Sequence, residues 1–498
     1  MNQLELPEII QHIKLDNYQT EKLYLDLTRS FTDTLKHYPI EINLFGVYFL
    51  DILKILSRII LCEREINHSL VIEEYKNKKI HYFPYISYKD FDSKPDILSK
   101  IYGKNVSIHQ TKLKKILNKV LSSKFLLTKK KHNVAFATPR VDSGRNLFWR
   151  DDLSVSSELI QAAEDWFALP DLEKQLDLIK NHITLLVKNH NFIFDPNIIG
   201  EVISNHIKAN CKNGMPNMKL KSDFVILRSG NELTNRMIGI TAMQQKIPVI
   251  NIMHGESFGV YDHPIASKYC EQLYSTGILG YGEKNLSIQD SYKYKNKENV
   301  VYIPSNAPSS FSLFKEHYMG VTHKKINYFY FPTSLRGLKH RHGPFMDAPD
   351  EVYLLWQNKL SSIFGDSITM KAHPKEKYKA SYKRSKMKMV FSTIFDALDG
   401  IDVFIFDFIG SAFNEACATD KPVIYFDLGI QNINSIALQY IKERTIYFDV
   451  SHHMPDMLEI QEKVGFTKKN NNYSINFSLY GERKSRIRSL TDSLDKVI

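Results

Sequence analysis

The sequence has few cysteines, and none of them has the spacing of a metal or redox site. Its four cysteines, Cys62, Cys211, Cys270 and Cys417, are scattered over 498 residues without a C-x-x-C pair. Isolated thiols of this kind are typical of reduced, structural cysteines. The sequence therefore argues against a disulfide framework and against a cysteine zinc site.

A long apolar run is also absent. The most apolar window, residues 45–61, is interrupted by Asp51, Lys54 and Arg58, and a membrane helix needs about 20 apolar residues. The first residues, MNQLELPEII, lack the basic start and apolar core of a secretory signal. We therefore expect a cytoplasmic protein without a spanning helix, for which a peripheral position at the inner membrane face stays open.

Length and composition indicate a folded protein of several domains. The chain has 498 residues, of which 43% are hydrophobic and 24% charged. These fractions are close to ordinary globular usage, and the length suits two to four domains at roughly 100 to 200 residues each.

The charge balance points to an anionic partner. The formal net charge is +11, with basic runs at residues 129–131 and between Lys371 and Lys388. No recognition-helix or RNA-binding signature accompanies these runs, which argues against nucleic acid as the partner. An anionic lipid surface or a lipid-linked acceptor fits better, and a solvated basic face without a dedicated partner is the plain alternative.

The pattern along the chain divides it into three parts. Residues 1–125 show helical spacing of apolar residues and form an accessory segment; the helices expected there cover 21–35, 44–61 and 113–121. A β-rich run at 133–137 could be the first strand of an α/β domain, and helices are expected at 154–168, 171–189 and 197–212.

From Asp223 onward, apolar strands and helices alternate in two series. The first contains DFVILRS, VINIMHG, QLYSTGIL and VVYIPS; the second contains NYFYFPTS, SITMKAHP, KMVFS, DVFIFDF, PVIYFD and TIYFDV. Continuous apolar strands separated by helices predict parallel sheets covered on both faces. With a linker at 306–325, the sequence predicts an α/β fold with parallel-sheet domains at 126–310 and 311–498.

Polar residues that directly follow apolar strands are the first candidates for a site, because parallel sheets bind ligands at their carboxyl ends. Five such groups occur, and they include Glu232, His254, Thr333 with Ser334, His373 with Pro374, and Gly410 with Ser411. Each group alone has a plain explanation as a cap or a turn. Their common position makes a shared site the stronger hypothesis.

The segment 402–427 carries the most detailed candidate. The small residues Gly410 and Ser411 would let a phosphate approach the start of the next helix. Glu415 lies four residues later on the same helical face, where it could accept hydrogen bonds from ribose hydroxyls. The alternative is that Ser411 is only an N-cap and Glu415 a first-turn acid favoured by the helix dipole.

The other candidates divide between phosphate binding and proton transfer. His373 could donate a hydrogen bond to a phosphate, and Thr333 and Ser334 could add neutral donors. A general base for transfer to a hydroxyl could be His254 or Glu232, with Asp262 and His263 in the loop that follows. We rank His254 slightly ahead, because the His-Gly-Glu turn places its imidazole at the mouth of a cleft.

These motifs together resemble the GT-B superfamily, in particular the branch that contains CDP-glycerol glycerophosphotransferases and the capsule-type Kdo and sialic acid transferases. The resemblance covers about residues 220–450 and is carried by IPVINIMHG, YFPTSLRG, MKAHPKE and IDVFIFDFIGSAFNEACATDKPVIYFD. It implies two Rossmann-like domains that face a cleft, with the donor nucleotide held mainly by the second.

The resemblance also implies roles for single residues. His373, Ser411 and Ser334 would contact donor phosphate and Glu415 would lie near the ribose. The glycerophosphotransferase branch favours His254 as base, and the Kdo and sialic acid branches favour Glu232.

The turn FDFIGSAF departs from the TDYSS type of teichoic acid enzymes. We therefore expect transfer of a sugar from a CMP- or CDP-activated donor to a surface polysaccharide or lipid-linked saccharide. CDP-glycerol or ribitol phosphotransfer and a non-catalytic nucleotide- or sugar-binding role are the alternatives. The one D-x-D triplet, Asp90 to Asp92, lies in the accessory segment, so we expect no cofactor and no obligatory metal.

Overall fold

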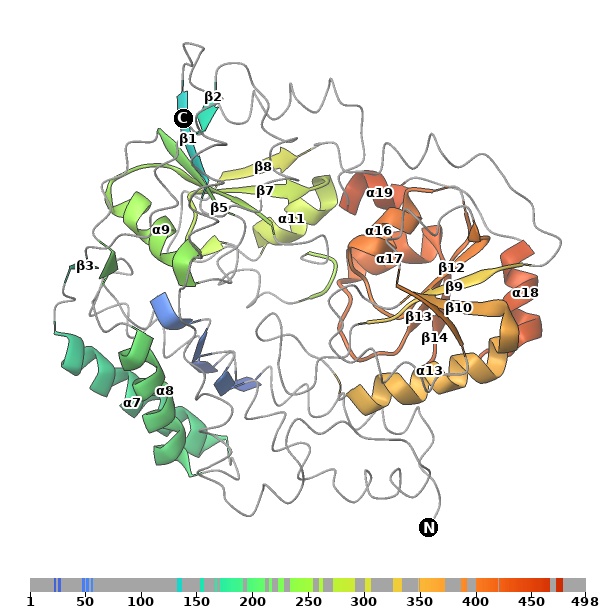
Figure 1. Cartoon of the computed structure of the whole chain (residues 1–498), viewed down its shortest axis with the longest axis horizontal. Coiled ribbons are helices and arrows are strands. Elements are labelled where there is room, and N and C mark those ends of the chain that lie inside the picture. The colour runs from blue at the N-terminus through green and yellow to red at the C-terminus, as the bar shows by residue number, and fades with distance from the viewer. Residues whose placement is uncertain are drawn as a thin grey trace.

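A computed structural model gives the fold of the chain (Figure 1). Two parallel β-sheets and their flanking helices account for most of the residues that the structure describes. These residues are 22–23, 26–27, 47–49, 51–52, 55–56, 132–136, 153–155, 166–167, 171–190, 195–210, 215–216, 223–227, 233–253, 259–262, 272–291, 301–305, 326–333, 348, 350–371, 387–391, 400–419, 421–465 and 472–477.

The first unit is built on a six-stranded sheet with the order β2-β1-β5-β6-β7-β8. All neighbouring strands in it are parallel. The apolar runs of the first series therefore form the predicted parallel sheet. Its strands are β1 (His132–Phe136), β2 (Leu153–Val155), β5 (Phe224–Leu227), β6 (Val249–Ile252), β7 (Gly277–Tyr281) and β8 (Val301–Ser305).

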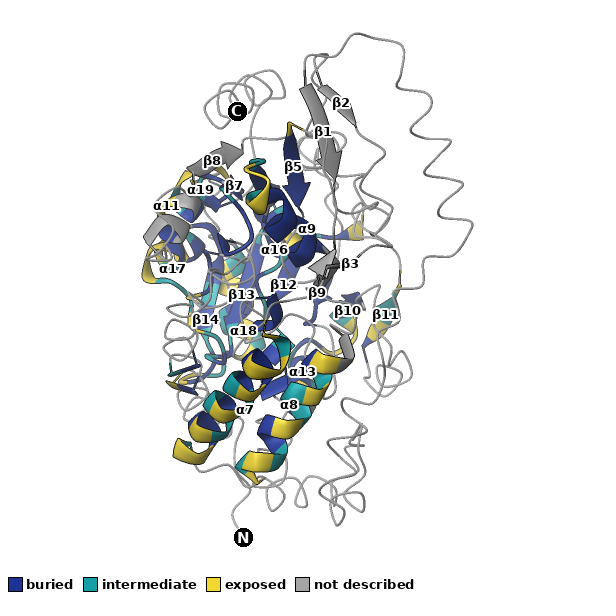
Figure 2. Cartoon of the chain, turned by 90° about the vertical axis from the view of Figure 1, so that its left-hand side faces the viewer, coloured by how far each residue is buried: buried dark blue, intermediate teal, exposed yellow. Residues whose placement is uncertain are grey.

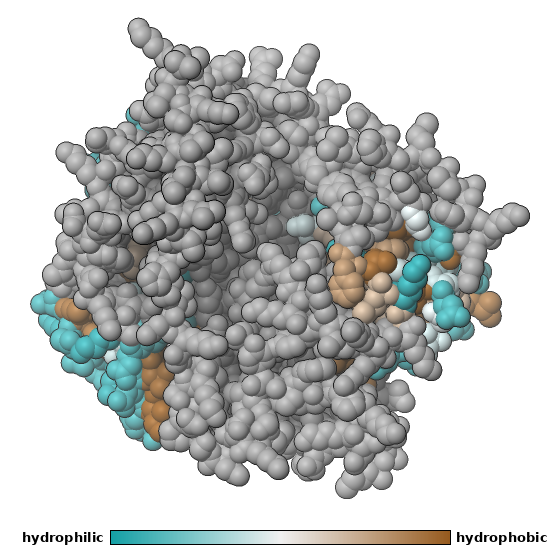
Figure 3. All heavy atoms as spheres, viewed as in Figure 1, coloured by the Kyte–Doolittle hydropathy of each residue, from teal (hydrophilic) through white to brown (hydrophobic). Residues whose placement is uncertain are grey.

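Four helices belong to this unit: α7 (Leu172–Asn189), α8 (Pro196–Asn210), α9 (Leu233–Gln244) and α11 (Glu283–Ser291). In α7, the buried Leu176, Ile179 and Ile183 recur at helical spacing and pack along α8. Figure 2 shows both helices striped, dark blue on the inner face and yellow on the outer face. Polar side chains cover most of that outer face in Figure 3. In the described part of the chain, no helix is long and apolar enough to cross a membrane.

The prediction of a helix at 154–168 is wrong at both ends of that range. The structure has strand β2 at its start, and β3 (Trp166–Phe167) at its end pairs in antiparallel fashion with β4 (Met215–Pro216). Strand pairing with distant residues therefore overrides the helical spacing, which short apolar runs cannot settle alone. The strand in QLYSTGIL is also shorter than expected, because a turn occupies its start and β7 begins at Gly277.

The described residues of the accessory segment are helical and pack on the first unit. Leu27, Tyr48 and Leu56 are completely buried. Arg236 of α9, itself 0% exposed, pairs with Asp51 of this segment. Removing one partner of a buried ion pair costs about 3 to 5 kcal/mol, so this contact ties the segment firmly to the sheet.

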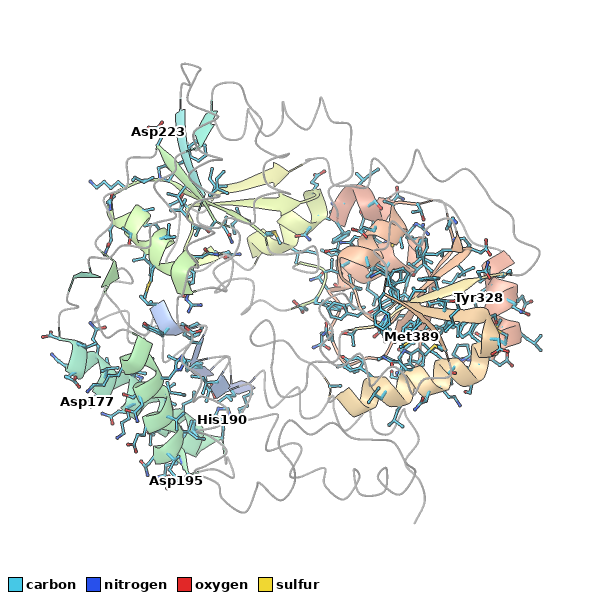
Figure 4. The ribbon with its side chains drawn as sticks, in the orientation of Figure 1. Asp177, His190, Asp195, Asp223, Tyr328 and Met389 are labelled. Atoms are coloured by element: carbon cyan, nitrogen blue, oxygen red, sulfur yellow. The ribbon has the colours of Figure 1, made fainter. Side chains whose placement is uncertain are left out.

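A polar contact with the same segment lies at the end of α7. His190 Nε2 lies 3.0 Å from Asp26 Oδ2 of the same accessory segment. Figure 4 shows His190 beside the blue N-terminal pieces. The helix expected at 113–121 lies outside the described residues.

The second unit is built on another six-stranded parallel sheet, with the order β11-β10-β9-β12-β13-β14. Numbered within the unit, this is the order 3-2-1-4-5-6 of the Rossmann fold. The chain is thus an α/β protein with two Rossmann-like parallel sheets. The strands of the second are β9 (Tyr328–Phe331), β10 (Ile368–Lys371), β11 (Lys388–Val390), β12 (Val403–Phe406), β13 (Val423–Asp427) and β14 (Ile446–Asp449).

Helices cover both faces of this sheet, and alternate strand residues supply two cores. Tyr330 and Ile405 belong to the core beneath α13 (Asp350–Phe364), where Trp356 is fully buried, and α18 (Met457–Gly465) lies on the same side. Phe329 and Phe406 belong to the core on the other face, with α16 (Ser411–Cys417), α17 (Ser435–Arg444) and α19 (Asn472–Phe477). Each fully buried side chain of this size contributes roughly 2 to 3 kcal/mol.

The two units meet where α19 packs on α11. Gly282, which precedes α11, has φ +96° and lies against the backbone of Asn476. A Cβ at this position would come within 2.5 Å of the Asn476 carbonyl carbon. Glycine is therefore required twice here, by the backbone conformation and by the close approach of α19.

Candidate functional site

The order of strands in the second sheet marks where a ligand can bind. The chain leaves β9 toward β10 on one side, and it returns to the other side of β9 with β12. In open parallel sheets the helices diverge at such a switch point and leave a crevice at the carboxyl ends of the two strands. The side chains that end β9, β10 and β12 therefore define the candidate site.

Asp407 joins the two strands of the switch point. It follows β12 directly, and its carboxylate accepts hydrogen bonds from the Tyr330 hydroxyl and, at 3.2 Å, from the Thr333 N–H, both on the β9 side. The side chain is only 6% exposed. Burial raises the pKa of Asp407 to about 7, although these hydrogen bonds favour the ionised form. The carboxylate thus links the carboxyl ends of β9 and β12.

A lysine and a glutamate face each other across the same edge. Lys371 ends β10, is 8% exposed, and has its Nζ 5.8 Å from the centre of the Phe331 ring. Glu415 lies in α16, and burial raises its pKa to about 7, while the charge of Lys371 offsets part of the rise. Burial likewise lowers the pKa of Lys371, and Glu415 opposes this. Within the described residues, neither group forms a hydrogen bond or an ion pair shorter than 4 Å.

The turn that begins α16 lies next to this pair. Gly410 is the N-cap residue, and Ser411 is the first residue of the helix and exposed. The backbone of Gly410 is extended (φ −148°, ψ −170°), so its conformation does not require glycine. Because Gly410 is the N-cap, the alternative that Ser411 caps the helix is wrong, and Ser411 is an exposed residue of the first helical turn.

Helix α16 is held by buried polar contacts along its length. The Arg444 guanidinium donates to the carbonyls of Cys417 (2.9 Å) and Ala416 (3.3 Å), and to two carbonyls just beyond the helix. Near the middle, the Tyr473 hydroxyl donates to Asn414 Oδ1 at 2.7 Å. These donors satisfy the last carbonyls of the short helix α16 and so hold it, with Glu415, in a fixed position.

The structure brings four of the predicted site residues together at this edge: Thr333, Gly410, Ser411 and Glu415. Thr333 is buried, and its backbone N–H is already used by Asp407. Asp262 is exposed and lies in the segment that contacts the second unit. The remaining candidates lie outside the described residues; they are Glu232, His254, His263, Ser334, His373, Pro374 and the Asp90–Asp92 triplet.

Sequence reasoning missed three residues of this site: Lys371, Asp407 and Tyr261. The lysine that ends the strand ITMK, two residues before His373, was the available signal for Lys371. For Asp407 the signal was the repeated strand ending Phe-Asp, which recurs at Asp427 and Asp449. Tyr261 comes from the first unit, and its hydroxyl accepts the Ile409 N–H at 2.6 Å; no local pattern distinguishes it.

The fold and this edge define a class: a two-unit parallel α/β protein whose second, Rossmann-like sheet has buried charged residues at its switch point. No protein-family model matches the chain, and no curated protein matches it.

Solved structures similar to the chain at low identity include the following three. The glycotransferase of kitacinnamycin shares 10% identity (TM-score 0.36; 74% of this chain, 99% of that one). The Anabaena protein HepE, in complex with UDP, shares 10% identity, with a TM-score of 0.35 over 73% of this chain and 99% of that one. A UDP-glucosyltransferase from Polygonum tinctorium capable of glucosylating indoxyl shares 10% identity, with a TM-score of 0.28 over 74% of this chain and 94% of that one. At these scores, the fold and the site rest on the chain's own sheets and side chains.

Proposed function

We propose that the chain is a GT-B-type glycosyltransferase that moves a sugar from a CMP- or CDP-activated donor to a surface polysaccharide or a lipid-linked saccharide. The observation that carries this proposal is the Lys371 ammonium beside Glu415 at the switch point of the second sheet. A buried cation without a hydrogen-bond partner among the described residues suits an anionic ligand that supplies one.

Donor phosphate is the anion that this edge suits. In the proposal, Lys371 neutralises the phosphate and the exposed Ser411 hydroxyl donates to it. His373, Pro374 and Ser334 follow the neighbouring strands in the sequence and complete the phosphate contacts. Thr333 can contribute only its side-chain hydroxyl, because Asp407 holds its N–H. Gly410 gives the turn a small residue next to the ligand.

Glu415 serves the ribose in this proposal. Its carboxylate lies one helical turn beyond Ser411, on the same face of α16. An ionised carboxylate accepts hydrogen bonds from two neighbouring hydroxyls, which a ribose presents and a deoxyribose does not. The positive charge of Lys371 lowers the pKa of Glu415 and therefore favours the ionised carboxylate.

The transfer step uses both units. The acceptor hydroxyl oxygen bonds to the anomeric carbon of the donor sugar, and the bond from that carbon to the phosphate oxygen breaks. The hydroxyl proton passes to a general base, for which His254 and Glu232 are the candidates of the first unit. The negative charge that develops on the leaving phosphate is stabilised by Lys371, without a metal as a necessary part.

A nucleotide screen followed by product analysis tests the function. Thermal-shift measurements with CMP, CDP, UDP and GDP should show stabilisation by a cytidine nucleotide, because a ligand of the native state raises the melting temperature. Incubation with the activated donor should then release the nucleotide and form a glycosidic bond. A new phosphodiester in the product would instead identify a glycerol- or ribitol-phosphate transferase, and a preference for UDP or GDP would overturn the donor assignment.

A further inference from the structure

The helix α19 belongs to both units. It packs on α11 of the first unit and on α16 and α17 of the second, and Figure 1 shows it in red beside α11. Its rings Tyr473 and Phe477 are completely buried. Ile288 of α11 is buried in the same core as these two rings. The hydrophobic core on this face of the second sheet is therefore shared between the two units.

Tyr473 connects α19 to the helix that carries Glu415. Its hydroxyl donates to Asn414 Oδ1 at 2.7 Å, and its ring lies 5.4 Å from that of Phe413, edge to face. Asn414 and Phe413 are completely buried, and Phe413 packs in turn on Phe406 of β12. A hydrogen bond and a ring contact on successive residues restrain rotation about the axis of α16. The helix α19 therefore fixes the place of Glu415, the next residue along α16.

Gly282 connects α19 to the first unit. It lies between β7 and α11, and a Cβ at this position would come within 2.5 Å of the Asn476 carbonyl group and 2.8 Å of the Phe477 nitrogen. Backbones in such close contact leave no space for one to slide over the other. A displacement of α11 relative to the second sheet must therefore move α19, and with it the Tyr473 side chain.

We propose that α19 is a coupling element that places Glu415 of α16 according to how α11 of the first unit is docked, with Tyr473 as its positioning residue. When the contact of α19 with α11 loosens, α16 loosens with it. The ribose site at Glu415 is then complete only while the two units are docked. This last consequence rests on the proposed function, whereas the coupling between α11 and α16 is independent of any ligand.

Hydrogen exchange of the ligand-free protein tests the coupling from the side of the first unit. Gly282→Ala forces a Cβ against Asn476, and we expect exchange to rise roughly tenfold in α19 and also in α16, which belongs to the other unit. Gly200→Ala is the matched control. Its Cβ would come within 2.3 Å of Thr184 Oγ1, so it also crowds the first unit, but between α7 and α8; α16 should keep its wild-type exchange rate.

Tyr473→Phe tests the other half of the coupling. It keeps the ring but removes the donor to Asn414, which should speed exchange in α16 roughly tenfold. Both substitutions loosen the same chain of contacts, so their effects on α16 should not multiply. We expect the double variant Gly282→Ala/Tyr473→Phe to exchange in α16 little faster than the faster single variant, whereas independent effects would multiply to roughly a hundredfold.

Calorimetric titration of the full chain with CDP and with 2′-deoxy-CDP tests the positioning of Glu415. In Tyr473→Phe, CDP should bind roughly tenfold more weakly, because Glu415 no longer meets the ribose hydroxyls. The affinity for 2′-deoxy-CDP should stay at its wild-type value, because in the proposed site its phosphates contact Lys371 of β10. A merely structural role for Tyr473 would weaken the binding of both nucleotides alike.

Each outcome decides one of these claims. Wild-type exchange in α16 of Gly282→Ala or of Tyr473→Phe, or multiplied effects in the double variant, would overturn the coupling. Should Gly282→Ala not fold, Ile288→Val, which removes one methyl group of α11 from the shared core, takes its place. An undiminished preference for CDP in Tyr473→Phe would overturn the positioning role while the proposed function stands. A protein that binds none of the nucleotides refutes the proposed function, and the exchange measurements then decide the coupling alone.

Discussion

Replacing Asp407 with asparagine should change how the stability of the second unit depends on pH. The wild-type side chain is 6% exposed, and its pKa is raised from 3.8 to about 7, chiefly by burial. A carboxyl group with a raised pKa is more easily accommodated when it is neutral. Its favourable contribution is therefore complete below about pH 4, where the unfolded chain also holds the proton, and it is lost as the pH rises through about 7.

The size of the effect follows from the two pKa values. Integrating the linkage from about pH 4 to pH 8 gives a loss of roughly 4 kcal/mol from Asp407 alone, most of it between about pH 5 and pH 8. An asparagine side chain cannot ionise, so this loss should disappear in Asp407→Asn. The substitution also weakens the pairing with Tyr330 and Thr333, which costs about 1 kcal/mol at every pH. The variant should thus be less stable than the wild type at about pH 4 and below, and more stable near pH 8.

Urea unfolding followed by the fluorescence of Trp356 measures this quantity in the second unit. The other two tryptophans, Trp149 and Trp166, precede the second sheet in the sequence and would be replaced by phenylalanine in all proteins compared. Asp402→Asn is the matched control. Asp402 also links β12 to β9, accepting the Asn327 N–H at 2.8 Å, but at the opposite edge of the sheet and partly exposed.

The control should follow the wild-type pH profile, while Asp407→Asn should cross it. If the wild-type and Asp407→Asn profiles run parallel from about pH 5 to pH 8, then Asp407 does not titrate in that range and our description of the switch point is wrong.

Three further substitutions test other parts of the structure. Arg444→Met should destabilise the second unit by roughly 3 kcal/mol in urea unfolding, because four carbonyls lose the guanidinium as a donor; a loss below ~1 kcal/mol would contradict the capping of α16. Gly282→Ala should cost about 2 kcal/mol or more through its positive φ and the contact with Asn476, and exchange in α19 should rise; an unchanged α19 argues against this contact. Glu415→Gln should abolish most of the roughly tenfold preference for a ribonucleotide over its 2′-deoxy and 3′-deoxy forms, measured by calorimetry; an undiminished preference would remove Glu415 from the ribose site.

Most strands of the two sheets, β2 excepted, could be predicted from the sequence, because strands buried on two faces are continuous apolar runs that few other structures require. The run VFIFD became β12 and VIYFD became β13, each within a residue or two of its expected ends. The helix expected at 154–168 failed for the opposite reason. Its ends are short strands, β2 and β3, whose pairing partners lie far away in the chain.

The candidate site was only partly predictable. Ser411 and Glu415 share one short helix, so their spacing is a local property that the sequence displays. The approach of Lys371 to Glu415 depends on the order of strands in the sheet, which periodicity does not reveal. The contact of Tyr261 with Ile409 joins residues 148 positions apart. The roles of His254, Glu232 and His373 remain predictions.

Calorimetric titration of the Lys371→Met variant tests the central claim most directly. Lys442→Met is the control, because Lys442 also lies over an aromatic ring, 4.8 Å from the centre of Tyr447, but belongs to α17. We expect the wild type and Lys442→Met to bind the cytidine nucleotide equally, and Lys371→Met to bind it about 10- to 100-fold more weakly, the loss of one charge-assisted phosphate contact. Equal affinity in all three proteins would contradict a phosphate site at the carboxyl edge of the second sheet.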